Sequence, residues 1–205
     1  MIPLSKSRKK GLIIILSAPS GTGKTTISNE IVRLLPGIKH VVTTTTRPPR
    51  KGEVDGVNYF FVSESEFKRR IEKEEFFEWA KVHGDYYGTP RKFIEESVKN
   101  GIDVLLTIDV QGGLSFKKEK PDSVLIFIAP PSEDVMKQRL YGRGTEDEKA
   151  MKKRIKTAEM EMTHIKDYDY WVVNDVLEKA VDEIKSVVIA ERRKVKRFPP
   201  GRKRS

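Results

Sequence analysis

A phosphate-binding loop near the N-terminus places the strongest constraint on the fold of this 205-residue chain. The stretch SAPSGTGKTT, residues 17–26, is close to the pattern G-x-x-x-x-G-K-[ST]. Gly23, Lys24 and Thr25 fill its last three places, and Ala18 stands where the first glycine is usual. An apolar run precedes the stretch and helical spacing follows it. Strand, loop and helix in this order predict a site for the phosphates of a nucleoside triphosphate.

The geometry of such a loop predicts what each residue does. Its backbone N–H groups point inward, and the following helix adds its positive end. Lys24 would reach the β- and γ-phosphates of ATP, and the Thr25 hydroxyl would face a magnesium ion bound with ATP. Alanine at position 18 fits if it keeps a negative φ. The predicted ATP contacts of the loop are Ala18, Pro19, Ser20, Gly21, Thr22, Gly23, Lys24, Thr25 and Thr26.

Apolar runs and helical spacing alternate along most of the chain. Strands are predicted at 12–17, 104–108, 124–128 and 170–173. Helices are predicted at 25–35, 90–101, from 132, from a capping box of Thr145 and Glu148 to about 165, and over 177–188. This alternation predicts an α/β fold, a three-layer α/β/α arrangement with a central parallel sheet. Residues 38–89 differ, because short strands, turns and one helix capped by Ser63 with Glu66 indicate an inserted mixed β/α subdomain.

The charge of the chain is concentrated at its ends. Residues 1–10 carry four basic and no acidic side chains, and residues 191–205 carry eight basic and one acidic, whereas the whole chain has a net charge of +10. The body is therefore nearly neutral, and we expect solvated, partly disordered tails. Weak contact with polyanions is the alternative, and no specific nucleic-acid partner is predicted.

Composition and the N-terminal segment predict a cytoplasmic protein. The chain has no cysteine, which fits a reducing compartment. The apolar run 12–16 follows a basic segment, but five residues are too few for the apolar part of a secretory signal, and no stretch is long enough to span a membrane. The assembly is predicted to be a monomer or a homodimer.

Four motifs after the loop carry a resemblance to a known family. TTTTRPPRKGEVDGVNYFFV, FFEWAKVHGDYYGTP, IDVQG and VND, in this order, resemble the guanylate kinase family over nearly all of residues 12–192. The resemblance implies a P-loop nucleoside monophosphate kinase that phosphorylates GMP and dGMP with ATP and Mg²⁺, yielding GDP or dGDP and ADP, in purine nucleotide metabolism. It also implies a single domain with a core (about 11–37, 90–141 and 166–193), a GMP-binding insertion (about 38–89), a small lid (about 142–165) and basic tails (1–10 and 194–205).

The resemblance implies a set of residues for the acceptor nucleotide. The guanine edge presents two adjacent donors, N1–H and the N2 amino group, which a carboxylate accepts together. Glu78 would be that carboxylate, with Asp109 on the other side of the amino group. Two guanidinium groups and two phenols would bind the phosphate. The implied GMP-binding residues are Thr43, Arg47, Arg50, Tyr59, Glu78, Tyr87, Thr89 and Asp109.

Phosphoryl transfer needs positive charge around the moving group and exclusion of water. The resemblance implies three lid arginines for this purpose and places Asn174 at the adenosine end of ATP. The implied catalytic residues are Lys24, Arg139, Arg143 and Arg154. One departure is Thr107, which stands where the family commonly has an acid. Metal affinity would then be lower, or another acid would compensate.

Two other functions compete with this interpretation. A related P-loop kinase acting on a phosphorylated sugar would share the loop but would not need the base-reading set. A catalytically inactive binding module would typically lack an intact loop and the lid arginines.

Two aromatic residues of the insertion are expected to have a structural role. Tyr86 and Trp79 are expected to pack in the core.

Overall fold

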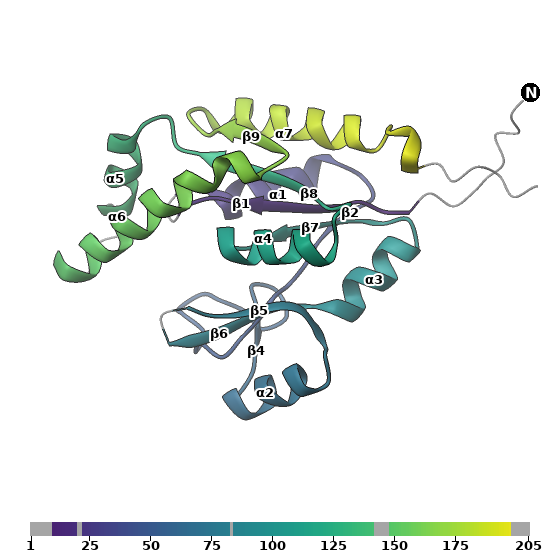
Figure 1. Ribbon diagram of the computed structural model, residues 1–205, viewed down its shortest axis with the longest axis horizontal. Coiled ribbons are helices and arrows are strands. Elements are labelled where there is room, and N and C mark those ends of the chain that lie inside the picture. The colour runs from purple at the N-terminus through teal and green to yellow at the C-terminus, as the bar shows by residue number, and fades with distance from the viewer. Residues whose placement is uncertain (1–9, 20–21, 83, 142–147, 198–205) are drawn as a thin grey trace, which may run out of the picture.

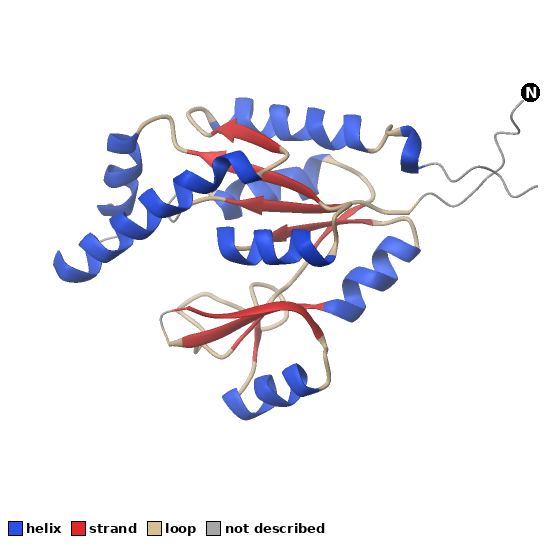
Figure 2. Cartoon of the chain, viewed as in Figure 1, coloured by secondary structure: helices blue, strands red, loops and turns tan. Residues whose placement is uncertain are grey.

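The computed structural model describes residues 10–19, 22–82, 84–141 and 148–197 (Figure 1). These residues form two sheets with helices around them (Figure 2). The larger sheet is parallel, with strands in the order β2-β7-β1-β8-β9. In this order they span Ile38–His40, Asp103–Thr107, Ile13–Ser17, Val124–Ala129 and Tyr170–Val173.

Helices cover both faces of the parallel sheet. In β1, Ile14 and Leu16 pack on one face with α1 (Lys24–Leu34) and α7 (Leu177–Glu191). Ile15 points to the opposite face, where Ile94 of α3 (Arg91–Lys99) and Phe116 of α4 (Val110–Glu119) complete the core. Because successive residues of a strand point to opposite faces, an apolar run such as β1 is buried on both. The predicted three-layer α/β/α fold is confirmed.

The second sheet is smaller and mixed, in the order β4-β3-β6-β5. Its strands span Phe60–Phe61, Thr44–Thr45, Asp85–Pro90 and Phe76–Val82, and α2 (Glu64–Glu72) packs on it through Phe67, below α4 in Figure 2. Ser63 caps α2 as predicted, its Oγ accepting a hydrogen bond from Glu66 N at 3.2 Å. The Glu66 carboxylate does not return to the cap, because it binds the guanidinium groups of Arg69 and Arg70.

Two elements correct the prediction from the sequence. Residues 38–40, expected in the insertion, form strand β2 at the edge of the larger sheet, paired with β7. Helix α4 was not predicted, because Gly112 and Gly113 give its first turns a low helix propensity. Asp109 offsets this as N-cap, its Oδ1 accepting a hydrogen bond from Gly112 N at 2.7 Å.

The C-terminal third adds α5 (Glu133–Tyr141), α6 (Glu148–Met162) and the short 3₁₀ segment Thr163–Asp167. Met136 and Leu140 of α5 pack against α6. Val135 N donates to Ser132 Oγ at 3.2 Å, which confirms that Ser132 begins α5. Thr145, predicted to cap α6, lies outside the described residues. No helix in the described ranges is long and apolar enough to cross a membrane.

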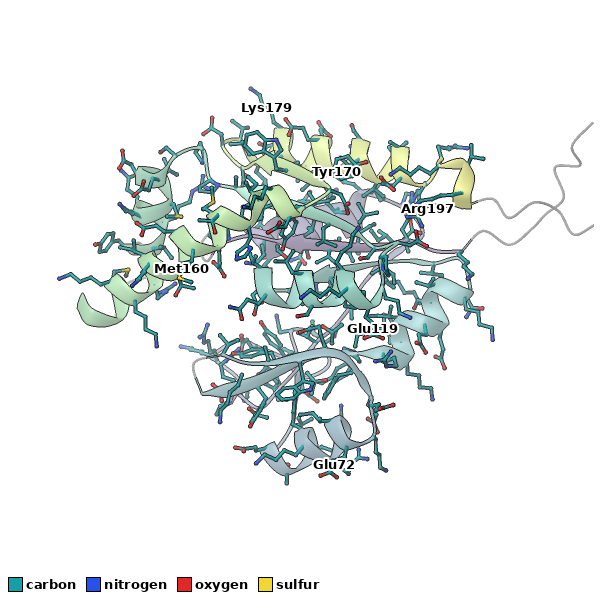
Figure 3. The ribbon with its side chains drawn as sticks, in the orientation of Figure 1. Glu72, Glu119, Met160, Tyr170, Lys179 and Arg197 are labelled. Atoms are coloured by element: carbon teal, nitrogen blue, oxygen red, sulfur yellow. The ribbon has the colours of Figure 1, made fainter. Side chains whose placement is uncertain are left out.

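The residues directly after α7 contact the end of that helix through Lys194 and Arg197. Val195–Arg197 form a 3₁₀ turn, and Arg197 lies at the end of the described chain beside α7 (Figure 3). Lys194 Nζ lies 2.5 Å from Glu191 Oε1, and Arg197 Nη2 lies 3.7 Å from Glu191 Oε2. Glu191 is only 2% exposed and also accepts a hydrogen bond from the Tyr170 hydroxyl at 2.6 Å. A buried carboxylate needs such partners. Residues 194–197 therefore make defined contacts, while Lys194, Val195 and Lys196 are exposed to solvent as expected. Residues 198–205 lie outside the described part.

Candidate active site

The loop between β1 and α1 has the backbone of a phosphate site. Gly23, the N-cap of α1, has φ 89°, in the left-handed region that favours glycine. Lys24 Nζ donates to the carbonyl oxygen of Ala18 at 2.5 Å, so the lysine folds back over the loop. Ala18 is buried. Ser20 and Gly21 of the predicted ATP set lie outside the described residues.

Asn174 holds the loop from the far side. Its Nδ2 donates to the Thr22 carbonyl at 2.7 Å, and a Cβ added to Gly23 would lie 2.9 Å from that nitrogen. Glycine is therefore required at position 23 both by its φ and by this close approach. Arg139 Nη1 donates to the Asn174 carbonyl at 3.0 Å, which brings one predicted lid arginine beside the loop. The contact of Asn174 with adenosine stays a prediction.

Two carboxylates converge on the N-terminus of α4. A methyl group at Gly112 would lie 3.1 Å from Glu78 Oε2 and 3.4 Å from Asp109 Oδ1. Glu78 comes from β5 in the insertion and Asp109 follows β7 in the core. The structure thus brings together the two residues expected to read guanine, and Gly112 leaves the space between them open.

Burial controls the charge of Glu78. The low-dielectric surroundings raise the pKa of Glu78 from its ordinary value of 4.5 to about 7, the hydrogen bond from Thr89 opposes this, and the negative charge of Asp109 adds to it. Thr89 Oγ1 donates to Glu78 Oε1 at 2.5 Å. A carboxyl group with this pKa gains or loses its proton near neutral pH, so its readiness to accept two donors depends on pH.

Three residues of the predicted phosphate set form a cluster. The guanidinium carbon of Arg47 lies 5.5 Å from the Tyr59 ring centroid, and the rings of Tyr59 and Tyr87 are 6.1 Å apart. Arg50 is exposed at the edge of the cluster. Glu53 was not predicted, yet it accepts hydrogen bonds from Arg47 Nη2 at 2.8 and 2.9 Å, and this bond holds the pKa of Glu53 below its ordinary value. The only signal for Glu53 was its place in the GEVDG part of the motif.

Residues 10–191 match the model of a family described as guanylate kinase. The chain belongs to the guanylate kinase family. A guanylate kinase of Desulfitobacterium hafniense (strain Y51) is 48% identical over 189 residues, which cover 92% of this chain and 94% of that protein. One of Caldanaerobacter subterraneus subsp. tengcongensis is 47% identical over 190 residues, 93% of this chain and 92% of that protein.

A solved structure agrees with the sequence relatives. The crystal structure of guanylate kinase from Anaplasma phagocytophilum matches with a TM-score of 0.78 and 36% identity, covering 92% of this chain and 90% of that one. The resemblance carried by the four motifs, and the α/β fold that it implied, are therefore confirmed for this member of the guanylate kinase family.

For the remaining predicted residues that lie in the described ranges, the structure gives their burial and position. Thr43 is half-buried, and its carbonyl accepts a hydrogen bond from Phe60 N at 2.8 Å. Thr25 and Thr26 are exposed in the first turn of α1. Arg154 is half-buried on α6, and Arg143 lies outside the described residues. The catalytic roles of these arginines stay predictions.

Thr107 stands where the family commonly has an acid, and Glu161 is an acid elsewhere in the chain that could compensate for it in magnesium binding. Thr107 Oγ1 lies 3.2 Å from His40 Nε2, and burial lowers the pKa of His40, so this place in the guanylate kinase motif is uncharged. Glu161, which the sequence did not single out, is half-buried on α6. Burial raises the pKa of Glu161, the positive charge of Lys24 opposes this rise, and the negative charge of Asp109 adds to it. Its only sequence signal is the helical spacing from the buried Ala158.

The residues beside the loop fit a magnesium ion that arrives with ATP. Within the described ranges no three His, Cys, Asp or Glu side chains form a group that could hold a metal. The oxygen donors available are the Thr25 hydroxyl, which is exposed, and the carboxylate of Glu161, which interacts electrostatically with Lys24 and with Asp109. Mg²⁺ takes oxygen ligands and usually keeps waters and substrate phosphates in its shell, so this donor set suits it.

Proposed function

We propose that this chain transfers the γ-phosphoryl group of ATP to GMP, giving GDP and ADP, and that dGMP is also accepted. The observation that carries the proposal is the convergence of Glu78 and Asp109 beside Gly112, at the same edge of the sheet as the phosphate loop. Leu16 pairs with Thr107 in the parallel register of β1 and β7, so the loop and Asp109 follow neighbouring strand ends. A base-reading pair and a triphosphate loop are thereby close enough to serve one reaction.

Glu78 and Asp109 supply the selectivity for guanine. The ionised carboxylate of Glu78 accepts N1–H and the N2 amino group, and Asp109 accepts the second proton of that amino group. Thr89 and Thr43 are the hydroxyl donors for O6. Adenine lacks the matching donors, so binding AMP would leave buried carboxylates unpaired, which discriminates by about 10⁴-fold or more.

Arg47, Arg50, Tyr59 and Tyr87 hold the acceptor phosphate. A phosphate dianion takes Arg47 from Glu53, because a bidentate guanidinium binds a dianion more strongly than a single carboxylate. The phenols of Tyr59 and Tyr87, already beside Arg47, complete the cradle. This fixes the attacking oxygen without any need for a general base.

The loop side holds the phosphoryl donor. Backbone N–H groups around Gly23 and the charge of Lys24 bind the β- and γ-phosphates. Mg²⁺ would be held by Thr25 and the phosphates, and when bound it neutralises charge that develops between the β- and γ-phosphates. Arg139, Arg143 and Arg154 surround the transferring group with positive charge and exclude water.

The assembly and the surroundings of the protein belong to the same proposal. We expect a cytoplasmic monomer or homodimer whose partners are ATP and GMP, with no membrane and no specific nucleic acid involved. Neither a sugar-phosphate kinase nor an inactive binding module is favoured by a specific feature of the described residues.

A coupled assay with purified protein tests the function. GMP, dGMP, AMP and ribose 5-phosphate are each supplied with ATP and Mg²⁺, for the parent, for Glu78→Gln and for the control Glu72→Gln, which changes an exposed carboxylate at the end of α2. We expect turnover of GMP and dGMP, at least about 10⁴-fold less of AMP, and loss of GMP turnover only in Glu78→Gln. Faster turnover of ribose 5-phosphate than of GMP would overturn the proposal.

A further inference from the structure

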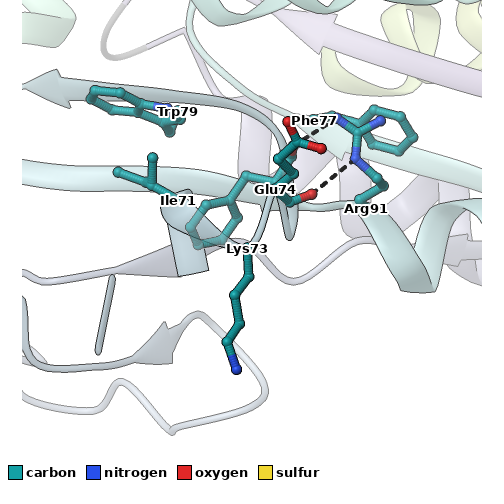
Figure 4. A pocket seen from close by; sticks show the side chains of 7 residues that line it. Ile71, Lys73, Glu74, Phe77, Trp79 and Arg91 are labelled. Carbon is teal, nitrogen blue, oxygen red and sulfur yellow. Dashed lines mark hydrogen bonds between the residues drawn. The ribbon is translucent and has the colours of Figure 1, made fainter. Parts of the chain in front are cut away.

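Arg91 joins the insertion to the core at a point remote from the phosphate loop. It is the first residue of α3, directly after β6. Its Nε donates to the Glu74 carbonyl at 3.2 Å and its Nη2 to the Phe76 carbonyl at 2.9 Å, as the dashed lines in Figure 4 show. Its Nη1 lies 2.5 Å from Glu119 Oε1, at the end of α4. One guanidinium therefore binds the start of β5 and the end of α4.

The ring of Phe77 lies in the same contact. The Arg91 guanidinium carbon is 4.3 Å from its centroid, and Lys120 Nζ is 5.0 Å from it. The ring also packs on Phe116 of α4, with centroids 4.9 Å apart. A cation on a ring face and a tilted aromatic pair favour one orientation. Because Glu78 follows Phe77 directly, the same contacts orient the carboxylate that faces Gly112.

The turn before β5 is held in a costly conformation. Glu74 has φ 54°, the one non-glycine residue with positive φ in the described ranges. A residue with a side chain is crowded in this conformation and adopts it rarely, so surrounding contacts must maintain it. Arg91 supplies two of these contacts. Its Nε donates a hydrogen bond to the Glu74 carbonyl, and its backbone N–H donates to the Glu75 carbonyl at 2.8 Å.

The arrangement fixes geometry more than it adds stability. The side chains of Arg91 and Glu119 are 29% and 37% exposed, and ion pairs exposed to this degree contribute little to stability. Their effect lies in where they act. Helix α4 begins at its cap Asp109 and ends at Glu119, so a contact at its end sets how β5 lies along it.

We propose that Arg91 is a positioning residue for guanine recognition, which fixes β5 against α4 so that Glu78 and Asp109 face the same base. The inference rests on the proposed function. Arg91 acts through the strand and the helix, and it belongs to neither predicted nucleotide set.

The test compares Arg91→Gln with Lys92→Gln, an exposed neighbour on the same helix. Arg91→Lys is the conservative variant, since lysine keeps the charge but not the planar fork. For each protein the KM values for GMP and for ATP are measured, together with the ratio of kcat/KM for GMP and for IMP. IMP lacks the N2 amino group, so this ratio reports how well the two carboxylates are placed.

In Arg91→Gln we expect the KM for GMP to rise about tenfold and the GMP preference over IMP to fall by a similar factor, with the KM for ATP within about twofold. Arg91→Lys should lie between it and the parent. If Arg91→Gln does not fold, Glu119→Gln should show the same pattern with a smaller change. A GMP/IMP ratio equal to that of Lys92→Gln, or equal losses for GMP and ATP, would overturn the inference. Failure of the parent itself to phosphorylate GMP would instead refute the proposed function.

Discussion

Thr89 donates a hydrogen bond to Glu78 at 2.5 Å, so two residues expected to bind guanine bind each other. Thr89 is fully buried, and Glu78 has the nearby charge of Asp109 to offset. The hydroxyl proton that would serve O6 is used by the carboxylate. Guanine must therefore replace a bond inside the protein, and its two donors make that exchange favourable only when Glu78 is ionised.

The affinity for GMP should depend on pH near neutrality. With a pKa of about 7, Glu78 is mostly protonated at pH 6 and mostly ionised at pH 8. We expect GMP to bind about tenfold more weakly at pH 6 than at pH 8, because only the ionised fraction is competent. Calorimetry in buffers of different ionisation enthalpy should detect the proton that is released on binding at pH 7.

The control for this experiment is Glu78→Gln, which keeps the titration of the GMP phosphate but has no carboxyl group at position 78. The same slope of affinity against pH in both proteins would assign the effect to the phosphate.

The titration of Glu78 also affects folding, and here a rise in pH lowers stability although it strengthens GMP binding. Because the pKa of Glu78 is higher in the folded state than its ordinary 4.5, the stability that the neutral carboxyl contributes is complete below pH 4.5 and is lost as pH rises through 7.

Gly112→Ala should damage GMP binding without damaging the fold. Alanine raises helix propensity by about 1 kcal/mol, but its methyl group would lie 3.1 Å from Glu78 Oε2 and displace that carboxylate. We expect the Kd for GMP to rise about tenfold with the Kd for ATP unchanged. Ser115→Ala, on the exposed side of α4, is the matched control. Unchanged GMP affinity in Gly112→Ala would mean that the two carboxylates do not meet the base at this point.

Lys24→Ala should fold normally and lose phosphoryl transfer. The Lys24 ammonium lies on the loop carbonyl of Ala18 and is the predicted cation for the transferring phosphate. We expect kcat to fall about 100-fold or more, while thermal unfolding stays near that of the control Lys39→Ala on the exposed side of β2. A kcat within about threefold of the parent would remove this lysine from the mechanism.

The C-terminal segment should divide sharply into a structural and a dispensable part. Removal of residues 198–205 should leave stability and turnover unchanged at moderate ionic strength. Removal of residues 194–205 also takes Lys194 and Arg197 from the buried Glu191, which we expect to cost about 1–3 kcal/mol of unfolding free energy. Urea unfolding of the two truncated proteins measures this, and equal midpoints would show that the docked turn contributes nothing.

The sequence predicted those parts of the site that depend on contiguous residues. The β1–loop–α1 unit follows from a local pattern, and so do the strand and helix periods around it. Helix α4 was missed because Gly112 and Gly113 are explained only by distant groups: a Cβ at Gly113 would lie 2.9 Å from both Ser17 Oγ and Tyr168 Oη. No local rule indicates that a helix should contain glycine for this reason.

Residues whose partners are far along the chain could not be recognised in the same way. Arg91 is one of many basic residues, and its role depends on Glu119, 28 positions later, and on a turn 17 positions earlier. Trp79 was expected in the core but is 48% exposed and packs on Tyr86, because alternation along β5 places it on the side opposite Glu78. The role of Arg91 and the exposure of Trp79 therefore depend on tertiary contacts, which local sequence patterns do not predict.

The insertion and the lid should close over the two nucleotides. Acceptor residues lie in the insertion, the loop lies in the core, and Arg154 lies on α6, so water is excluded only when these parts approach one another. Arg47 forms an ion pair with Glu53 at 2.8 Å, which the phosphate of GMP would have to replace. We predict hinges near Gly37, which has φ 78°, near Pro90, and near Gly142, which is outside the described residues.

Energy transfer between two dyes would measure this closure. Because the chain has no cysteine, dyes can be attached only to introduced cysteines, at the exposed positions Lys51 and Met160. We expect energy transfer between them to rise with GMP and further with a bisubstrate analogue, while a core pair at Lys39 and Lys179 stays constant. Equal transfer in the free and the doubly occupied protein would refute closure and leave the reaction assignment intact.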